Sequence, residues 1–330
     1  MMIRKVGNAN TKKKLVIKGL SNVPKLPDNF NSTTWDKLSR SIKAIHDSEP
    51  VSESKETLYN SVKDLCLHKF AEETYKKLHD QYQLYMTEAG KNLHFNMKQG
   101  ADTLSLLHNL HDIWNSHCQQ IRMIRDIFLY LDRTYVFQTK IHSLWEMGCL
   151  LFRSEIMNDK IFVDSIVKGI LSVFESDRKG EMIERSFLQN IVRMFIALKL
   201  YDDEFEGEFL CDTKEFYNLK GTEQLNNHDS AFYLSFCENC LKEEQERAKT
   251  HLSDSTSPKL LHIVEEQLIG NHAEEILDKG FFSMMDENEL DNLKRCYNLL
   301  YKVKGLEYIK SFLNSYVQVR LYFQQLLYLI

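Results

Sequence analysis

QQIRMIRDIFLYLDRTYVF, residues 119–137, forms a predicted helix with two apolar rows. The first row recurs at alternating spacings of three and four, which indicates one helical face turned toward a core; it consists of Ile121, Ile124, Phe128, Leu131 and Tyr135. The second row lies beside it and consists of Met123, Ile127, Tyr130 and Phe137, with Thr134 between the last two. Such a helix is either enclosed within its own domain or shared with a partner, and periodicity alone leaves both interpretations open.

The same helical pattern extends along most of the 330 residues, a length that suits about two or three domains or one elongated array. The four prolines, at positions 24, 27, 50 and 258, leave the segment between the last two free of the strongest helix breaker. Apolar rows follow one another without strand patterns, so the sequence predicts an all-α fold of long helices. In the first bundle, the third helix is expected over 72–88, the fourth over 103–118 and the fifth over 119–137.

The composition and net charge limit the classes of function that the chain can have. Hydrophobic residues make up 43% and charged residues 27%, which is typical of a globular protein. The net charge of -5 argues against a nucleic-acid binder that uses its whole surface. Seven scattered cysteines indicate free thiols in a reducing compartment. Because neither a signal peptide nor a run of about 18 apolar residues is found, we expect a soluble intracellular protein without membrane or direct nucleic-acid contact.

Two groups of residues have spacings that suit metal ligands. His108 and His111 share a helical face, with His117 further on, while Cys237 and Cys240 form a CxxC pair. Neither group has a carboxylate or a second cysteine pair that completes a ligand set, so we interpret both as packing residues and expect no metal and no cofactor.

An acidic run in the second bundle resembles a pair of catalytic carboxylates. It consists of Asp202, Asp203, Glu204, Glu206 and Glu208. Because Phe205 and Phe209 lie four residues apart on the opposite face, the acids are interpreted as the solvated side of a helix.

The N-terminal arm, residues 1–32, is basic over its first 25 residues. Within it, Leu15, Val16 and Ile17 favour β-structure and suit a strand added to another protein's sheet edge. A solvated tail or a nuclear-import signal is the alternative interpretation. On the second predicted helix, Tyr59 and Lys63 lie beside the buried row, where they either anchor a partner or cover the first helix.

The last predicted helix has one apolar row that reaches the final residue, formed by Phe312, Tyr316, Val319, Phe323, Leu326 and Ile330. We expect this bundle to be incomplete or to need a partner.

Several stretches together resemble the N-terminal half of the cullin family, closest to its cullin-4 subfamily. They are KKKLVIKGLSNVPKLPDNF (12–30), TTWDKL (33–38), TLYNSVKDLCLHKF (57–70), IRMIRDIFLYLDRTYV (121–136), LWEMGCLLFR (144–153) and SPKLLHIVEEQLIGNH (257–272). The resemblance implies an elongated stack of five-helix cullin repeats in which the third is incomplete. It divides the chain into the arm and repeats at 33–139, 140–254 and 255–330.

In that family the second and fifth helices of the first repeat hold an adaptor. For cullin-4-like chains this adaptor is damaged-DNA-binding protein 1, a triple β-propeller that brings substrate receptors. The resemblance implies an inserted arm formed by Leu15, Val16, Ile17 and Leu20. It implies helix contacts through Tyr59, Val62, Lys63, Met123, Ile127, Tyr130 and Thr134. The implied function is a non-catalytic scaffold of a cullin-RING ubiquitin ligase, in the nucleus and cytoplasm.

The sequence also departs from a full cullin. The half that binds a RING-box protein is absent, so that protein is not expected as a partner, and the family pattern is expected to stop near Asn314. We therefore interpret the chain as a fragment, a truncated product or a competitor of the complete scaffold. The alternative function is a helical-repeat tethering or transport subunit. An enzyme is disfavoured because no phosphate-binding loop, metal-binding motif or activated nucleophile is recognisable.

Overall fold

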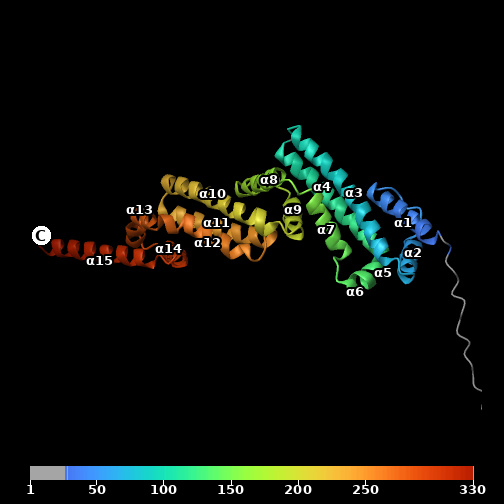
Figure 1. Cartoon of the computed structure of the whole chain (residues 1–330). Helices are drawn as coiled ribbons and strands as arrows, with labels where there is room; N and C mark the ends of the chain where they lie inside the picture. The colour runs from blue at the N-terminus through green and yellow to red at the C-terminus, as the bar shows by residue number, and fades with distance from the viewer. Residues whose placement is uncertain (1–26, 28, 101, 330) are drawn as a thin grey trace, which may run out of the picture.

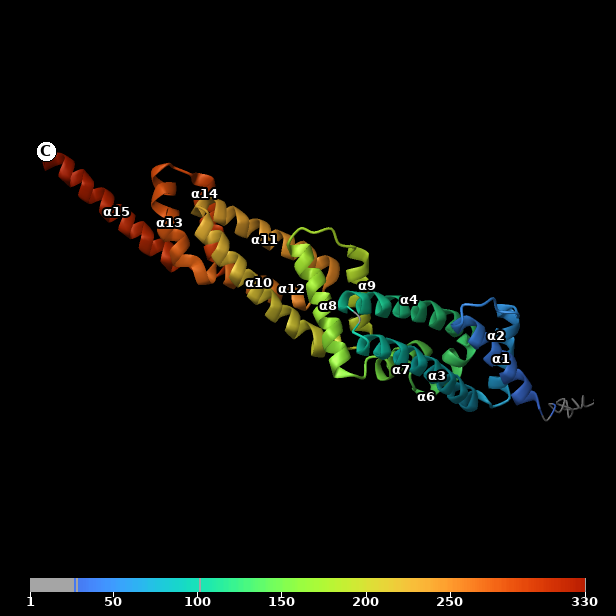
Figure 2. The same cartoon turned by 90° about the horizontal axis from the view of Figure 1, so that it is seen from above.

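The computed structural model describes residues 27, 29–100 and 102–329, and every regular element within these ranges is helical. The helices stack into an elongated rod, with α1 and α2 at one end and α15 projecting from the other (Figures 1 and 2). The predicted all-α, elongated fold is thereby confirmed. Within the described residues, no helix is both long enough and apolar enough to cross a bilayer.

The first part of the rod is built from four substantial helices and a short irregular segment. These elements are α1 (Phe30–His46), α2 (Lys55–Leu67), α3 (Ala71–Lys98), α4 (Thr103–Ile127), α5 (Leu129–Leu131), the π-helical turn η1 (Asp132–Val136) and α6 (Phe137–Thr139). Polar side chains begin two of the helices: the Ser54 hydroxyl accepts from the Thr57 amide at the start of α2, and the Asp102 carboxylate accepts from two amides at the start of α4.

The remaining helices continue the stack. They are α7 (Leu144–Glu155), α8 (Lys160–Arg178), α9 (Arg185–Ala197), η2 (Tyr201–Phe205), α10 (Glu206–Asn227), α11 (Ser230–His251), α12 (Thr256–Leu268), η3 (Gly270–His272), α13 (Ala273–Asp286), α14 (Leu290–Lys302) and α15 (Leu306–Leu329). Short connections at 140–143 and 252–255 adjoin the expected repeat boundaries. The division into repeats stays a prediction.

Two predicted helix boundaries in the first bundle are wrong. The third helix continues ten residues past position 88 and ends before Gly100, whose φ of +80° suits glycine. The fourth helix does not end at 118, because no glycine or proline interrupts the residues that follow. It continues to Ile127 and breaks at Phe128, whose backbone leaves the helical region (φ −91°, ψ 16°) while its side chain is buried in the core.

A close helix contact joins the first bundle to the second. A Cβ atom on Gly90 of α3 would lie 2.5 Å from the Glu155 carbonyl oxygen at the end of α7, so the approach requires glycine there. The Glu155 carboxylate accepts hydrogen bonds from Gln83 (2.9 Å) and Thr87 (2.8 Å) of α3. Backbone proximity and side-chain bonding together hold α7 against α3, so we expect this junction to be stiff.

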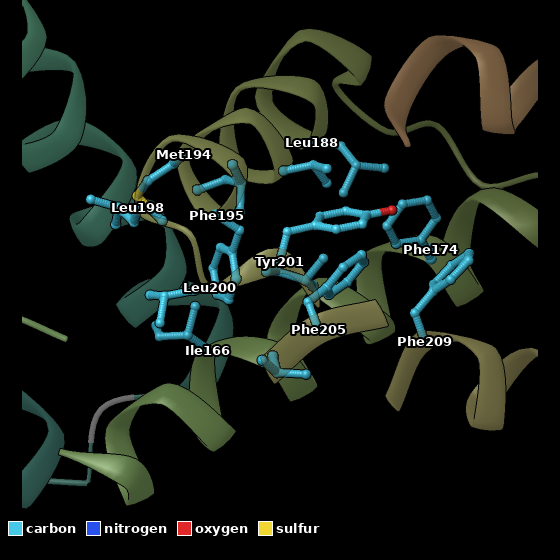
Figure 3. Packing of buried hydrophobic residues seen from close by; sticks show 14 of the residues in the cluster. Ile166, Phe174, Leu188, Met194, Phe195, Leu198, Leu200, Tyr201, Phe205 and Phe209 are labelled. Atoms are coloured by element: carbon cyan, nitrogen blue, oxygen red, sulfur yellow. The ribbon is translucent and has the colours of Figure 1, made fainter. Parts of the chain in front are cut away.

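The middle of the rod is packed around aromatic rings. Phe174 of α8 lies 4.8 Å from Phe209 between ring centroids, and Phe205 stacks on Phe209 at 5.5 Å (Figure 3). Both predicted inward-facing phenylalanines are therefore buried. The interpretation of the acidic run as solvated is wrong for Glu206, which is 9% exposed. Its carboxylate accepts hydrogen bonds from Thr256 (2.7 Å) and Lys259 (2.8 Å), partners about 50 positions away that local periodicity does not reveal.

A buried charge network ties α8, α10 and α11 together. The Glu244 carboxylate accepts hydrogen bonds from the Arg178 guanidinium (3.0 Å), from the Tyr217 hydroxyl (2.8 Å) and from Arg247. The side chains of Glu244 and Arg178 are fully enclosed, and that of Arg247 is 7% exposed. Arg247 also binds Asp177 (2.5 Å). Charges this deep require their partners, since an unpaired buried ion is strongly destabilising.

Two buried histidines make the first bundle sensitive to acid. Burial lowers the pKa of His46 to about 4 and that of His117 to about 3. An unfolded chain protonates histidine below about pH 6.5. Between about pH 6.5 and 4 the unfolded state therefore binds more protons, and stability falls as the pH falls. We expect a loss on the order of 4 kcal/mol between pH 8 and pH 5 from these two groups.

Denaturant unfolding at a series of pH values measures this loss. The variant His46→Gln should reduce the slope of the unfolding free energy against pH by the equivalent of close to one proton. The variant His68→Gln, at an exposed position, should leave that slope unchanged. An identical slope for wild type and His46→Gln would contradict the assignment.

Candidate protein-interaction surface

The second helix lies beside the end of α4 and the segment that follows the break at Phe128. Lys55 at the start of α2 forms an ion pair with Asp126 (2.5 Å), and the Tyr59 ring meets the Tyr130 ring edge-on with centroids 6.5 Å apart. In both pairs the partner follows at the same number of positions along the chain. The two segments therefore run in the same direction. Continuing this register places Lys63 level with Thr134.

Asp132 fixes the position of the segment that carries Tyr130. One carboxylate oxygen accepts from the Arg125 guanidinium (3.2 Å), and the other accepts from the Leu144 amide at the start of α7 (3.1 Å). Ser143 and Glu146 close a capping box at the same helix start. Asp132 therefore has a structural role, because it aligns η1 with the start of α7.

The predicted contact residues of the two helices divide into an accessible set and a buried set. Met123 is 48% exposed, Lys63 is exposed, and Tyr59, Tyr130 and Thr134 are half-buried. These five residues lie on or beside the paired α2 and α5–η1 segments and form what we call the repeat-1 surface. Leu15, Val16, Ile17 and Leu20 of the predicted arm lie outside the described residues.

Two predicted contacts are enclosed by the same chain. Val62 has no exposed area, because it continues the α2 row of Leu58 and Leu65 that faces the bundle. Ile127 is only 5% exposed. The prediction of a continuous exposed row is wrong for Ile127: Met123, one turn earlier on α4, is exposed, whereas Ile127 lies beside Ile45 and Leu58 of α1 and α2.

Ile127 can still be reached from outside through a cavity. It lines a cavity of about 190 Å³ beside the repeat-1 surface, together with Ile45, Val51, Glu53, Lys55, Leu58, Met123 and Asp126. An apolar cavity of about 150 Å³ is large enough to hold a benzene ring. This cavity therefore suits one apolar side chain presented from outside.

Two exposed apolar residues extend the repeat-1 surface beyond the predicted contacts. Leu67 is 59% exposed and follows Tyr59 and Lys63 at spacings of four on α2. Phe137 is 80% exposed and follows Tyr130 by seven positions. The spacing of Leu67 from Tyr59 and Lys63 could have identified it from the sequence, but it was not used. Phe137 was placed on the second apolar row of its helix but was not among the predicted contact residues. With these two residues the surface becomes a strip of exposed apolar and aromatic groups, which suits protein recognition.

The structure does not assemble the residues considered as metal ligands. His108 and His111 pack against the Phe187 ring, at 4.3 and 4.8 Å between centroids, while His117 lies apart from them and hydrogen-bonds Tyr82 (2.8 Å). Cys237 and Cys240 are buried, and burial raises the pKa of the Cys240 thiol to about 12. Among the residues that the structure describes, no group of three histidine, cysteine or acidic side chains is placed to hold a metal ion.

Comparisons with known proteins bear on the fold and on the family of the chain. Residues 35–325 match the sequence model of the cullin α-solenoid domain. Human Cullin-4A is 37% identical over 318 residues, covering 93% of this chain and 42% of that protein. Cullin-4 of Dictyostelium discoideum is 34% identical over 315 residues, covering 94% and 39%, and Cullin-3A of Arabidopsis thaliana is 30% identical over 295, covering 88% and 40%.

The chain thus spans about two-fifths of the length of these relatives. The match through residue 325 also shows that the expected departure from the family near Asn314 is wrong.

Proposed function

We propose that this chain, which belongs to the cullin family, is a non-catalytic scaffold subunit of a cullin-RING ubiquitin ligase. In this role the repeat-1 surface would hold an adaptor at one end of the rod. The adaptor would be a triple β-propeller similar to damaged-DNA-binding protein 1, with substrate receptors attached to it. Identities of 34–37% to Cullin-4 proteins, against 29–32% to Cullin-3 proteins, support an adaptor of the cullin-4 kind.

The observation that carries the proposal is the strip of exposed apolar side chains on α2, near the end of α4 and on the segment from Tyr130 to Phe137. Leu67, Met123 and Phe137 are 59%, 48% and 80% exposed, although the same helices bury their opposite faces in the bundle. Water contact with three large apolar groups is unfavourable, and a partner that covers them would remove it.

The rest of the rod would position the substrate receptors that are attached to the adaptor. The close α3–α7 approach at Gly90 and the buried network around Glu244 would resist bending at these two places along the rod. A scaffold needs this stiffness, because an adaptor held on a flexible stalk would not keep a fixed distance from the other end.

Affinity purification of the full chain, followed by quantitative mass spectrometry, tests the proposal. We expect wild type to recover a triple-propeller adaptor with its receptors. The double variant Leu67→Asp/Phe137→Asp should recover at least 10-fold less, because each charge would have to be desolvated in the interface. The loss should not reflect unfolding, since both positions are exposed.

Leu84→Asp, at a 72% exposed position of α3, is the matched control and should behave as wild type. Recovery of vesicle-tethering subunits in place of the adaptor would contradict the scaffold proposal.

A further inference from the structure

A groove of about 460 Å³ lies between α8 and α10 on the flank of the rod. Figures 1 and 2 show these two helices in the middle of the rod, away from α2 and α5, which carry the repeat-1 surface. Binding sites in proteins commonly have volumes of roughly 300–1,000 Å³. The groove is therefore large enough for several side chains of a partner, and it is separate from the surface proposed to hold the adaptor.

The groove presents an apolar side chain to solvent. Leu219 of α10 is 66% exposed, and Phe216, three positions earlier, is half-buried. Both side chains line the groove. Removing apolar area from water is favourable in proportion to the area covered, so a complex in which a partner covers Leu219 would be stabilised.

The charges that line the groove are not balanced. Four carboxylates and two ammonium groups leave an excess of two negative charges; the acids are Glu175, Asp212, Glu215 and Glu223, and the lysines are Lys179 and Lys220. Lys220 is held over the rings of Phe216 and Phe236, at 5.3 and 5.6 Å from their centroids. The negative excess repels the phosphates of nucleic acids and of anionic lipids, and it attracts a basic protein segment.

Two of the four acids already have partners. Glu175 forms an ion pair with the lysine of the next turn (2.7 Å), and Asp212 accepts a hydrogen bond from the buried Arg178 guanidinium (3.3 Å). Burial raises the pKa of Asp212, and the nearby Glu175 and Glu215 carboxylates raise it further against the effect of the guanidinium. Glu215 and Glu223 are exposed and form no ion pair within the part of the chain that the structure describes. A cationic partner would relieve the repulsion among these carboxylates.

The two unpaired acids are arranged around the exposed leucine. Glu215, Leu219 and Glu223 follow one another at spacings of four, so they form one row along the exposed face of α10. With a rise of about 1.5 Å per residue, the two acids are about 12 Å apart along the helix, with the leucine midway between them. This separation is too large for both carboxylates to hold one ion. The row therefore offers two sites for positive charge and, between them, one for an apolar side chain.

We propose that the groove is a docking site for an extended segment of another protein that carries an apolar side chain between two basic ones. An extended segment rises about 3.3 Å per residue, so basic residues four positions apart are separated by about 13 Å, close to the separation of the two acids. Residues two positions apart point to the same side of such a segment, which directs the apolar side chain toward Leu219. The partner would have the pattern basic-x-apolar-x-basic.

This site goes beyond the proposed function and does not depend on it. Because the groove lies on α8 and α10 and the repeat-1 surface lies on α2 and α5–η1, one chain could bind both partners at once. The scaffold would then position a second protein along the rod as well as an adaptor at its end.

Nuclear magnetic resonance titration of the full chain, labelled at leucine methyl groups, tests the proposal with peptides as probes. The basic probe has the sequence AKALAKA, and the acidic probe has glutamate in place of both lysines. Exposed ion pairs contribute little, so we expect saturable shifts of the Leu219 methyl signals with a Kd on the order of 1 mM at low salt. The probe AKAAAKA, which lacks the leucine, should bind several-fold more weakly, and the acidic probe should not bind.

Charge reversal supplies the sharpest comparison. Glu215→Lys/Glu223→Lys should weaken binding of the basic probe at least 10-fold and should acquire binding of the acidic probe. Glu274→Lys/Asp278→Lys on α13 changes the net charge equally and should bind the basic probe as wild type does. All four positions are exposed, so both variants are expected to fold, which circular dichroism would verify.

Three results would overturn the proposal: no shift of the Leu219 methyl signals in wild type at about 5 mM basic probe; equal binding of that probe by wild type and by Glu215→Lys/Glu223→Lys; or equal losses in the two double variants. Each measurement uses the chain and a peptide without adaptor, so the proposed scaffold function is judged separately.

Discussion

Replacing Tyr130 by alanine is expected to weaken binding of the triple-propeller adaptor by about 30-fold, because truncating a central aromatic anchor typically costs about 2 kcal/mol or more. The Tyr130 side chain is half-buried against its own bundle and packs edge-on against Tyr59, so its ring is held in place before a partner arrives. A preorganised ring loses little conformational freedom on binding. Isothermal titration calorimetry with purified adaptor measures the change.

Two further variants serve as comparisons for Tyr130→Ala. Tyr130→Phe keeps the ring and should stay within a few-fold of wild type. Removal of Lys12 to Lys14 should weaken binding less than Tyr130→Ala does. In the arm, net hydrogen-bond gains of about 0.5–1.5 kcal/mol each are offset by about 1–2 kcal/mol for ordering each residue. Equal affinities for Tyr130→Ala and wild type would reject the assignment of this anchor.

The largest effect on stability is expected at Glu244. Glu244→Ala should lower the free energy of unfolding by about 3–5 kcal/mol, because it leaves Arg178 and Arg247 buried without their shared carboxylate. Asp177 and Asp212 still bind one arginine each, so part of the charge stays compensated. Urea unfolding followed by circular dichroism measures the change.

The neighbouring position supplies the control. Glu243 is exposed one residue earlier on α11, and Glu243→Ala should change stability by less than about 0.5 kcal/mol. Glu244→Gln keeps the shape and part of the hydrogen bonding but not the charge, so its loss should be intermediate. A Glu244→Ala protein as stable as Glu243→Ala would show that the network contributes little to the stability of the rod.

Apolar periodicity was sufficient to predict the fold class and most of the buried faces. The row of Leu58, Val62 and Leu65 is buried as its spacing predicts. Such rows are local, since each residue follows the previous one within a single helix. They identify a buried face without knowledge of what covers it.

Features that depend on distant partners could not be predicted in this way. The break at Phe128 has no glycine or proline to signal it, because it arises where the Phe128 side chain enters the core. Periodicity likewise does not reveal that Ile127 is buried while Met123, one turn earlier on α4, is exposed, because the neighbours of Ile127 come from α1 and α2. Glu206 looked solvated because the residues that bind it, Thr256 and Lys259, come from another helix.

The central claim is that one face of the α2 and α5–η1 pair packs on its own bundle while the other is covered by an adaptor. Hydroxyl-radical footprinting, read by mass spectrometry on the free chain and on the chain with adaptor, tests this directly, because methionine and aromatic side chains react readily when exposed. The account predicts that oxidation of Met123, Tyr130 and Phe137 falls several-fold in the complex while that of Phe95, 61% exposed on α3, does not change. Unchanged oxidation of the first three residues in a saturated complex would contradict it.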